Sequence, residues 1–395
     1  MSSEIEAVLG FVVAFAVAAL LTPLTKRLAV RTGVVDLPRA RGLSSHATPL
    51  LGGLAILAAV LVASWIWLPH THRWEAVAGA CILITAVGVA DDRWSLHPLV
   101  KLVGQIAAAW ICVQAGVVVS NVTIPFLGAF DLGAWGKPLT ILGLVAVMNI
   151  VNFSDGIDGL AAGVCGIVAV AFAIIAFDLG RDTAGILAAI TAGAALGFLI
   201  YNFYPASVFM GDAGSNLLGL LMGVVTVEAA VKTQAVASLV IPLALLAVPF
   251  LDTTFVVLKR LKYHRPVYEA DAWHFHHRLV AIGFSQRRTV LYLYAWTLLL
   301  AGFALALRFI PYTHYVGNEK QIQWGWMLVL IGVALIVIVA SIYLVYVLEI
   351  LKFRRLSALR VRRDQPDATA AEIDRAAAEA LETGEFQAIV REGDG

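Results

Sequence analysis

The stretch NIVNFSDGIDGLAAGVCGIVAVAFAIIAF, residues 149–177, joins a polar segment to an almost entirely apolar one. The apolar part is close to the length of a membrane-spanning helix, which needs about 20 mostly apolar residues. The polar part places Asn149, Asn152, Asp155 and Asp158 at intervals of three. A bare charge at the centre of a bilayer costs about 3 kcal/mol or more. The rest of the chain therefore has to explain why these side chains occur beside a membrane span.

The whole chain is strongly apolar. Of its 395 residues 60% are hydrophobic and only 14% are charged, and its mean hydropathy is +0.85. About eleven stretches could span a membrane: 6–24, 50–69, 75–90, 99–118, 136–152, 160–177, 184–203, 216–231, 235–257, 290–310 and 326–350. Cys81, Cys112 and Cys165 fall within these stretches, so we expect packing residues and no disulfide. The sequence predicts an all-α, polytopic integral membrane protein with about eleven transmembrane helices.

Basic residues are distributed unevenly between the two sides of the predicted membrane domain. All but six of the 28 lysines and arginines fall on one side; the six on the other are Arg73, Lys137, Arg181, Lys232, Arg308 and Lys320. Loops rich in Lys and Arg stay in the cytoplasm. This predicts a cell-membrane protein with its N-terminus outside and its C-terminus cytoplasmic.

The composition changes near residue 352. The sequence beyond it is first basic and then rich in Ala and Glu, and Thr369 with Glu372 forms a capping-box pattern typical of a helix start. We predict a transmembrane domain over residues 1–352 and a soluble cytoplasmic tail with a short helix over residues 353–395. The first span lacks a basic leader and a clear cleavage site, so no cleaved signal peptide is expected.

Five connections carry polar clusters, and all five lie on the predicted cytoplasmic side. They are DLPRARGLSSHATPLLGG (36–53), DDRWSLHPLVKL (91–102), the opening stretch, NFYPASVFMGDAGSN (202–216) and DAWHFHHRL (271–279). Each cluster alone could be a helix cap, an ordinary turn or a basic anchor loop. Five clusters on one side indicate a functional site at that face.

The opening stretch can be interpreted further. Residues three apart lie on one stripe of a helix, so Asn149 and Asn152 face the same way. A continuous helix would carry Asp158 to the far side, but Gly156 and Gly159 allow the chain to break. We therefore expect these polar groups to surround the mouth of a cytoplasmic cavity, where water and a metal ion offset the cost of burial.

Carboxylate and amide oxygens without a Cys/His ligand set suit a hard cation, which predicts Mg²⁺, with Mn²⁺ as the alternative. The His-rich loop supplies hydrogen-bond donors that can bind phosphate. Among them is Arg278, which can bind an anion in a bidentate manner. The sequence contains no Walker A, dinucleotide-binding or zinc pattern, and no nucleic-acid partner is expected. The combination indicates phosphoryl transfer from a cytosolic substrate to a component of the membrane.

With these five motifs in this order, the chain resembles the polyprenyl-phosphate N-acetylhexosamine-1-phosphate transferases over roughly residues 5–350. The resemblance implies transfer of N-acetylhexosamine 1-phosphate, foremost GlcNAc-1-phosphate, from the UDP-sugar to undecaprenyl phosphate. The products would be undecaprenyl-diphospho-sugar and UMP, in the first membrane step of a cell-envelope polysaccharide pathway. The implied partners are UDP-N-acetylhexosamine, undecaprenyl phosphate and membrane lipid, and the sequence is compatible with a homo-oligomer.

The same resemblance implies roles for individual residues. The implied metal ligands are Asn152 and Asp212. The implied catalytic residues are Asp91, Asp92, Asp155, Asp158 and His277. The implied substrate-binding residues are Asp36, His46, Asn149, Asn202, Phe209, His274, His276 and Arg278, with Asn202 and Phe209 at the uridine.

Physical chemistry also limits the mechanism. A phosphate monoester has a second pKa near ~6, so the lipid phosphate is largely dianionic at pH 7 and hardly needs a general base. We therefore prefer direct attack of the lipid phosphate on the β-phosphorus over an aspartyl-phosphate intermediate.

Three alternatives stay open. The HFHHRL pattern is closer to the GlcNAc-1-phosphate branch of the family than to the phospho-MurNAc-pentapeptide translocase. However, Gly42 and Ala270 stand where the family usually has Lys and often has Pro, which leaves the translocase as the first alternative. A secondary transporter would predict polar residues near the midplane and an inverted repeat, and the sequence shows neither. A non-catalytic scaffold does not explain the set of carboxylates.

Overall fold

The computed structural model describes residues 2–36, 47–124, 128–231, 284–316 and 319–343, with the single residues 247, 251 and 369. Within them the chain forms ten α-helices: α1 Ser3–Thr32, α2 Gly52–Trp67, α3 His72–Trp94, α4 Pro98–Gln114, α5 Gly136–Ser154, α6 Leu160–Asp178, α7 Asp182–Asn202, α8 Gly211–Thr226, α12 Gln286–Phe309 and α13 Trp324–Ile342. They overlap ten of the predicted spans. The remaining span, 235–257, lies outside the described residues except for residues 247 and 251.

The helices confirm a polytopic membrane protein. In the described part of the chain, seven are long and apolar enough to cross a membrane: α1, α3, α5 with the 3₁₀ turn Gly133–Trp135 before it, α6, α7, α12 and α13. Helices α2 and α4 are apolar but shorter. The number of about eleven spans, the orientation of the termini and the domain boundary at residue 352 stay predictions.

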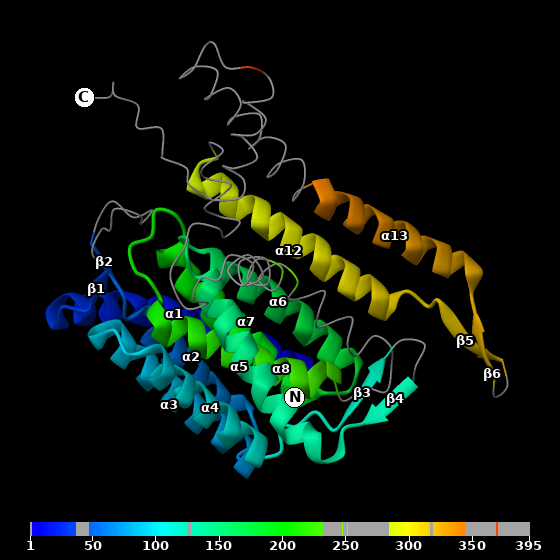
Figure 1. The fold of residues 1–395 in the computed structure, drawn as a ribbon, viewed down its shortest axis with the longest axis horizontal. Helices are drawn as coiled ribbons and strands as arrows, with labels where there is room; N and C mark the ends of the chain where they lie inside the picture. Colours follow the sequence, from blue (N-terminus) through cyan, green and yellow to red (C-terminus); the bar gives the residue numbers. More distant parts are fainter. Residues whose placement is uncertain are drawn as a thin grey trace.

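Three short antiparallel hairpins were not predicted. They pair β1 (Val35–Asp36) with β2 (Thr48–Pro49), β3 (Asn121–Ile124) with β4 (Gly128–Asp131), and β5 (Thr313–Val316) with β6 (Glu319–Ile322). Such pairing satisfies backbone groups that no helix can satisfy between two spans. The β1–β2 hairpin lies at one end of the helix bundle and the other two lie at the opposite end (Figure 1).

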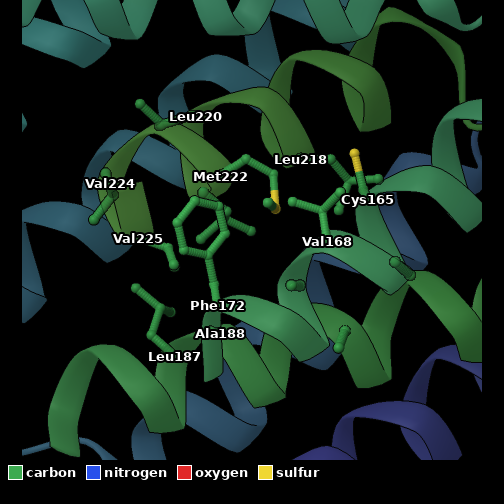
Figure 2. Packing of buried hydrophobic residues seen from close by; sticks show 14 of the residues in the cluster. Cys165, Val168, Phe172, Leu187, Ala188, Leu218, Leu220, Met222, Val224 and Val225 are labelled. Carbon is green, nitrogen blue, oxygen red and sulfur yellow. The ribbon is translucent and has the colours of Figure 1, made fainter. Parts of the chain in front are cut away.

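The core is formed by α6, α7 and α8. The ring of Phe172 on α6 is fully buried and lies among Leu187 of α7 and Met222 and Val225 of α8 (Figure 2). Helix α1 packs along α7, whereas α3 and α5 pack against α8. Helix α12 packs on α6, and α13 lies outside it (Figure 1). The three cysteines are buried and free, as predicted.

Successive helices alternate in direction, and this brings distant polar segments to one end of the bundle. The connection between α7 and α8 lies against the start of α2: the Phe209 N–H donates to the Pro49 carbonyl at 2.8 Å, and the Gly52 N–H donates to the Phe209 carbonyl at 3.0 Å. The C-terminal ends of α3 and α5 meet the N-terminal ends of α4 and α8 at this same end, through the contacts described below.

Candidate active site

Asp92, near the C-terminal end of α3, holds the first turn of α8. Its Oδ1 accepts the N–H of Asp212 at 2.9 Å, and its Oδ2 accepts the N–H of Ala213 at 3.3 Å. The first N–H groups of a helix have no partner within the helix, and a carboxylate also complements the positive end of the helix dipole. The predicted start of this span at residue 216 is wrong, because the helix begins at Gly211. Asp212 therefore belongs to the helix and not to the preceding connection.

Two glycines make this contact close. Gly88 lies one turn before Asp92 on α3, and a Cβ there would lie 2.6 Å from the carbonyl carbon of Asp212. Gly211 has a φ of +66°, and a Cβ on it would lie 2.8 Å from the carboxyl carbon of Asp92. Larger side chains would push α3 and α8 apart at the position where Asp92 bonds to Asp212.

Lys101, in the first turn of α4, lies between two carboxylates. Its Nζ is 3.0 Å from Oδ2 of Asp91 and is also paired with Asp212. The other oxygen of Asp91 accepts the N–H of Leu96 at 2.8 Å, which fixes Asp91 at the turn between α3 and α4. Lys101 was not among the predicted site residues. The available signal was its position one turn into the helix that follows the paired aspartates.

Asn152, near the C-terminal end of α5, lies against Asp212. Its Nδ2 donates to Oδ1 of Asp212 at 3.0 Å and to the hydroxyl of Ser215 at 2.8 Å. The two residues that were predicted to share a metal ion are therefore in direct contact. One oxygen of Asp212 faces Asn152, and the other faces Lys101.

The predicted break between the two aspartates of the opening stretch is confirmed. Helix α5 ends at Ser154, α6 begins at Leu160, and Gly159 between them has a φ of +79°. Burial, followed by the nearby carboxylates of Asp212, Asp92 and Asp158, raises the pKa of Asp155 well above its usual range. Asp155 thus lies within the electrostatic reach of the other acidic groups.

Asp158 is held by the connection between α7 and α8. Its Oδ2 accepts the N–H of Ala206 at 2.8 Å. Burial raises the pKa of Asp158, and the hydrogen bond from Ala206 opposes that rise. The carboxyl group is therefore fixed in position at the break between α5 and α6.

Both backbone polar groups of Gly159 are hydrogen-bonded. Its N–H donates to Oδ1 of Asn202 at 3.1 Å, and its carbonyl accepts the hydroxyl of Tyr294 on α12 at 2.5 Å. Asn202 is only 2% exposed, and its Nδ2 donates to the carbonyl of Val208 at 3.0 Å. Asn202 therefore joins the break between α5 and α6 to the connection that carries Phe209, and its contact with the uridine stays a prediction.

The other predicted site residues are less closely connected. Asn149 lies one turn below Asn152 on α5, where its amide bonds to Gln105 of α4. Asp36 lies in β1 opposite Thr48. His46, His274, His276, His277 and Arg278 lie outside the described residues. The described structure thus brings Asp91, Asp92, Asn152, Asp155 and Asp212 together at one end of the bundle.

The helices that carry these residues also match a known protein family. The model of glycosyl transferase family 4 matches residues 74–230, which include α4 to α8 and nearly all of α3. All the converging acidic residues and Asn152 and Lys101 fall within the match.

Three relatives cover most of the chain. The probable undecaprenyl-phosphate N-acetylglucosaminyl 1-phosphate transferase of Bacillus subtilis is 36% identical over 294 residues, 73% of this chain and 82% of that protein. The decaprenyl-phosphate N-acetylglucosaminephosphotransferase of Mycolicibacterium smegmatis is 38% identical over 316 residues, 72% of this chain and 78% of that protein. The phospho-N-acetylmuramoyl-pentapeptide-transferase of Desulforudis audaxviator is 33% identical over 334 residues, 76% of this chain and 97% of that protein.

Proposed function

Because the chain belongs to glycosyl transferase family 4, we propose that it transfers N-acetylhexosamine 1-phosphate from a UDP-sugar to a polyprenyl phosphate in the membrane. GlcNAc is the proposed sugar, since two of the relatives are named for it, and undecaprenyl phosphate is the proposed lipid. The observation that carries the proposal is the convergence of Asp91, Asp92 and Asp212 with Lys101 and Asn152. From the charge distribution, this end of the bundle is proposed to face the cytoplasm.

Mg²⁺ is the proposed cofactor, with Mn²⁺ as its substitute. The donor set fits a hard cation, because carboxylate and amide side chains, whose oxygens are the ligands such a cation prefers, meet there. The ammonium of Lys101 already lies between two of the carboxylates, so this position stabilises positive charge. Asp212 and Asn152 are proposed to hold the ion, with Asp91 and Asp92 beside it. When bound, the ion would offset the negative charge of the phosphates and align them.

The proposed reaction is direct attack. An oxygen of the dianionic lipid phosphate forms a bond to the β-phosphorus of the donor, the bond from that phosphorus to the bridging oxygen breaks, and UMP leaves with that oxygen. A covalent route through Asp92 is disfavoured, because both of its oxygens accept helix N–H groups, which lowers their nucleophilicity. Asp91 is likewise bonded at both oxygens, by Leu96 and Lys101. These bonds support direct attack, with Asp91 and Lys101 proposed to orient the lipid phosphate.

The donor nucleotide-sugar is proposed to lie across the break between α5 and α6. Asp155 and Asp158 would position it, and the ring of Phe209 offers a face for the uracil. The remaining proposed substrate contacts are Asp36, His46, Asn149, Asn202, His274, His276 and Arg278, and His277 is proposed to be catalytic.

The test is UMP release by the purified protein in detergent. UDP-GlcNAc, undecaprenyl phosphate and Mg²⁺ together should yield UMP, whereas omission of the lipid, chelation of the metal or the Asp212→Ala substitution should abolish it. A transporter would release no UMP under any of these conditions. Labelled UMP should exchange into the UDP-sugar only when polyprenyl phosphate is present, and exchange without lipid would contradict direct attack.

A second candidate donor is UDP-MurNAc-pentapeptide, because a relative named for that transfer is 33% identical to this chain. Both donors should be offered to the same preparation at equal concentration. Preferential consumption of UDP-GlcNAc supports the first proposal, and preferential consumption of the pentapeptide donor would replace it.

A further inference from the structure

Three amide side chains lie one helical turn from the site residues. Each is three or four positions along its own helix from a site residue, so each pair lies on one helix face. The pairs are Lys101 with Gln105 on α4, Asn152 with Asn149 on α5, and Asp212 with Asn216 on α8. The polar end of the bundle therefore has two layers, a layer of site residues and a layer of amides beneath it.

Gln105 is the centre of the amide layer. Its Nε2 donates to Oδ1 of Asn216 at 2.8 Å and, more weakly, to Oδ1 of Asn149 at 3.4 Å. Its Oε1 accepts Nδ2 of Asn149 at 2.8 Å. Gln105 and Asn216 are each only 3% exposed. Burying an amide is costly unless it is hydrogen-bonded, and here the amides of three helices satisfy one another.

Two of the amides also donate to backbone carbonyls of their own helices. Nδ2 of Asn216 donates to the carbonyl of Asp212 at 2.8 Å, and Nδ2 of Asn149 donates to the carbonyl of Val145 at 2.8 Å. Asn149 and Asn216 are thus each bonded both across helices and to their own helix. Because hydrogen bonds are directional, this arrangement fixes how α4, α5 and α8 are rotated relative to one another. Apolar packing alone is non-directional and would leave that rotation less defined.

We propose that Gln105, Asn149 and Asn216 are positioning residues for the transfer reaction. Their network sets the rotation of three helices, so that the ammonium of Lys101, the amide of Asn152 and the carboxylate of Asp212 meet one turn away. The inference rests on the proposed function and extends it to Gln105 and Asn216, which have no proposed contact with substrate or metal, and it gives Asn149 a positioning role besides its proposed substrate contact. Gln105 carries the clearest test, because it bonds to both of the other amides.

The test compares Gln105→Leu with a matched control. Leucine has a similar volume but its side chain cannot form hydrogen bonds, so it leaves the amides of Asn149 and Asn216 without their shared partner. Thr191→Val is the control, because Thr191 on α7 is also fully buried but bonds only within its own helix, to the Leu187 carbonyl at 2.8 Å. Both variants and the wild type should be compared in detergent for kcat, for KM of the UDP-sugar, for Mn²⁺ affinity by electron paramagnetic resonance and for the unfolding midpoint.

Substitution of residues that orient metal ligands typically lowers activity or metal affinity by roughly 10- to 100-fold. We expect Gln105→Leu to lower kcat and Mn²⁺ affinity by about this factor while KM changes little, and Thr191→Val to leave all three unchanged. In the double variant Gln105→Leu/Asn216→Leu the loss should be smaller than the product of the two single losses, since both substitutions remove the same bond.

The outcomes separate the inference from the proposed function. If the wild type transfers sugar phosphate but Gln105→Leu keeps its kcat and its Mn²⁺ affinity, the inference is overturned and the function stands. If Gln105→Leu loses activity only in proportion to a lowered unfolding midpoint, the network is structural and the inference is also overturned. A wild type that releases no UMP overturns the proposed function, and the inference falls with it.

Discussion

The carboxylate of Asp92 accepts the backbone N–H of Asp212 at 2.9 Å, although the two residues lie 120 positions apart in the sequence. One acidic side chain therefore stabilises the first turn of the helix that carries another. This gives Asp92 two separable properties, its charge and its capacity to accept hydrogen bonds from α8. Substitution by asparagine separates the two, because it removes the charge and keeps an acceptor.

Asp92→Asn should abolish most of the activity and spare the fold. Asparagine caps helix starts about as well as aspartate does, and its Oδ1 can still accept the Asp212 N–H. The negative charge beside the proposed metal ion is lost, so we expect kcat to fall by roughly 10- to 100-fold, the order found when a group next to metal ligands is removed. Asp92→Ala removes both properties and should in addition lower the free energy of unfolding by about 1 kcal/mol. Equal stability losses in the two variants would contradict this division.

Gly88→Ala should disrupt the site by separating α3 from α8. A methyl group there would meet the backbone of α8 at Asp212, and overpacking of this kind costs about 1–3 kcal/mol. Separation of α3 from α8 would break the bond from Asp92 to Asp212 and lower activity. The control is Gly79→Ala on the same helix, where a Cβ meets nothing within 4 Å. UMP release and unfolding midpoints of both variants check this, and a fully active Gly88→Ala would show that the close approach is unimportant.

Lys101→Met should have opposite effects on metal binding and on rate. Lys101 is paired with Asp91 and Asp212, so its charge competes with any divalent cation at these carboxylates. Its removal should tighten Mn²⁺ binding several-fold, because like charges repel strongly at a partly buried site. The rate should still fall by at least about tenfold, since a donor to the lipid phosphate is lost. Mn²⁺ titration and initial rates test the two parts, and weaker Mn²⁺ binding would contradict the first.

Tyr294→Phe should loosen the break between α5 and α6. The substitution removes the bond to the Gly159 carbonyl and nothing else, which costs about 1 kcal/mol of stability. Since Asp155 and Asp158 lie in this break, we expect KM for the UDP-sugar to rise several-fold with a smaller change in kcat. Tyr292→Phe on the same helix is the control, because Tyr292 is 41% exposed and its ring stays in edge contact with Phe284. Identical kinetics of the two variants would remove Tyr294 from the site.

The helices could be predicted from the sequence because their apolar stretches match the thickness of a bilayer. The break between α5 and α6 could also be predicted from Gly159, since glycine adopts a positive φ without strain. The start of α8 was predicted too late, because Gly211 and Asp212 resemble a turn and an apolar window does not include them. The acceptors of its first N–H groups lie on α3, far away in the sequence.

The site was only partly predictable for the same reason. Asp91, Asp92, Asn152 and Asp212 could be identified because acidic and amide groups at the end of an apolar span need an explanation. From the sequence, Lys101 was noted only as one of the basic residues on the predicted cytoplasmic side. In the structure it pairs with two of these carboxylates. Gln105 and Asn216 gave a weaker signal still, since a single amide in an apolar helix does not reveal which helix holds its partner.

The bond between Asp92 and the start of α8 also has a consequence for biosynthesis. Helices enter the membrane in the order of synthesis, so α3 and α4 are in place well before Gly211 leaves the ribosome. Until then Asp92 has no helix start to hold, and in the described part of the chain the cation paired with a carboxylate of α3 is Lys101, at Asp91. A chain arrested before residue 211 should consequently be a preferred target of membrane quality control, and one released after Thr226 should resist it.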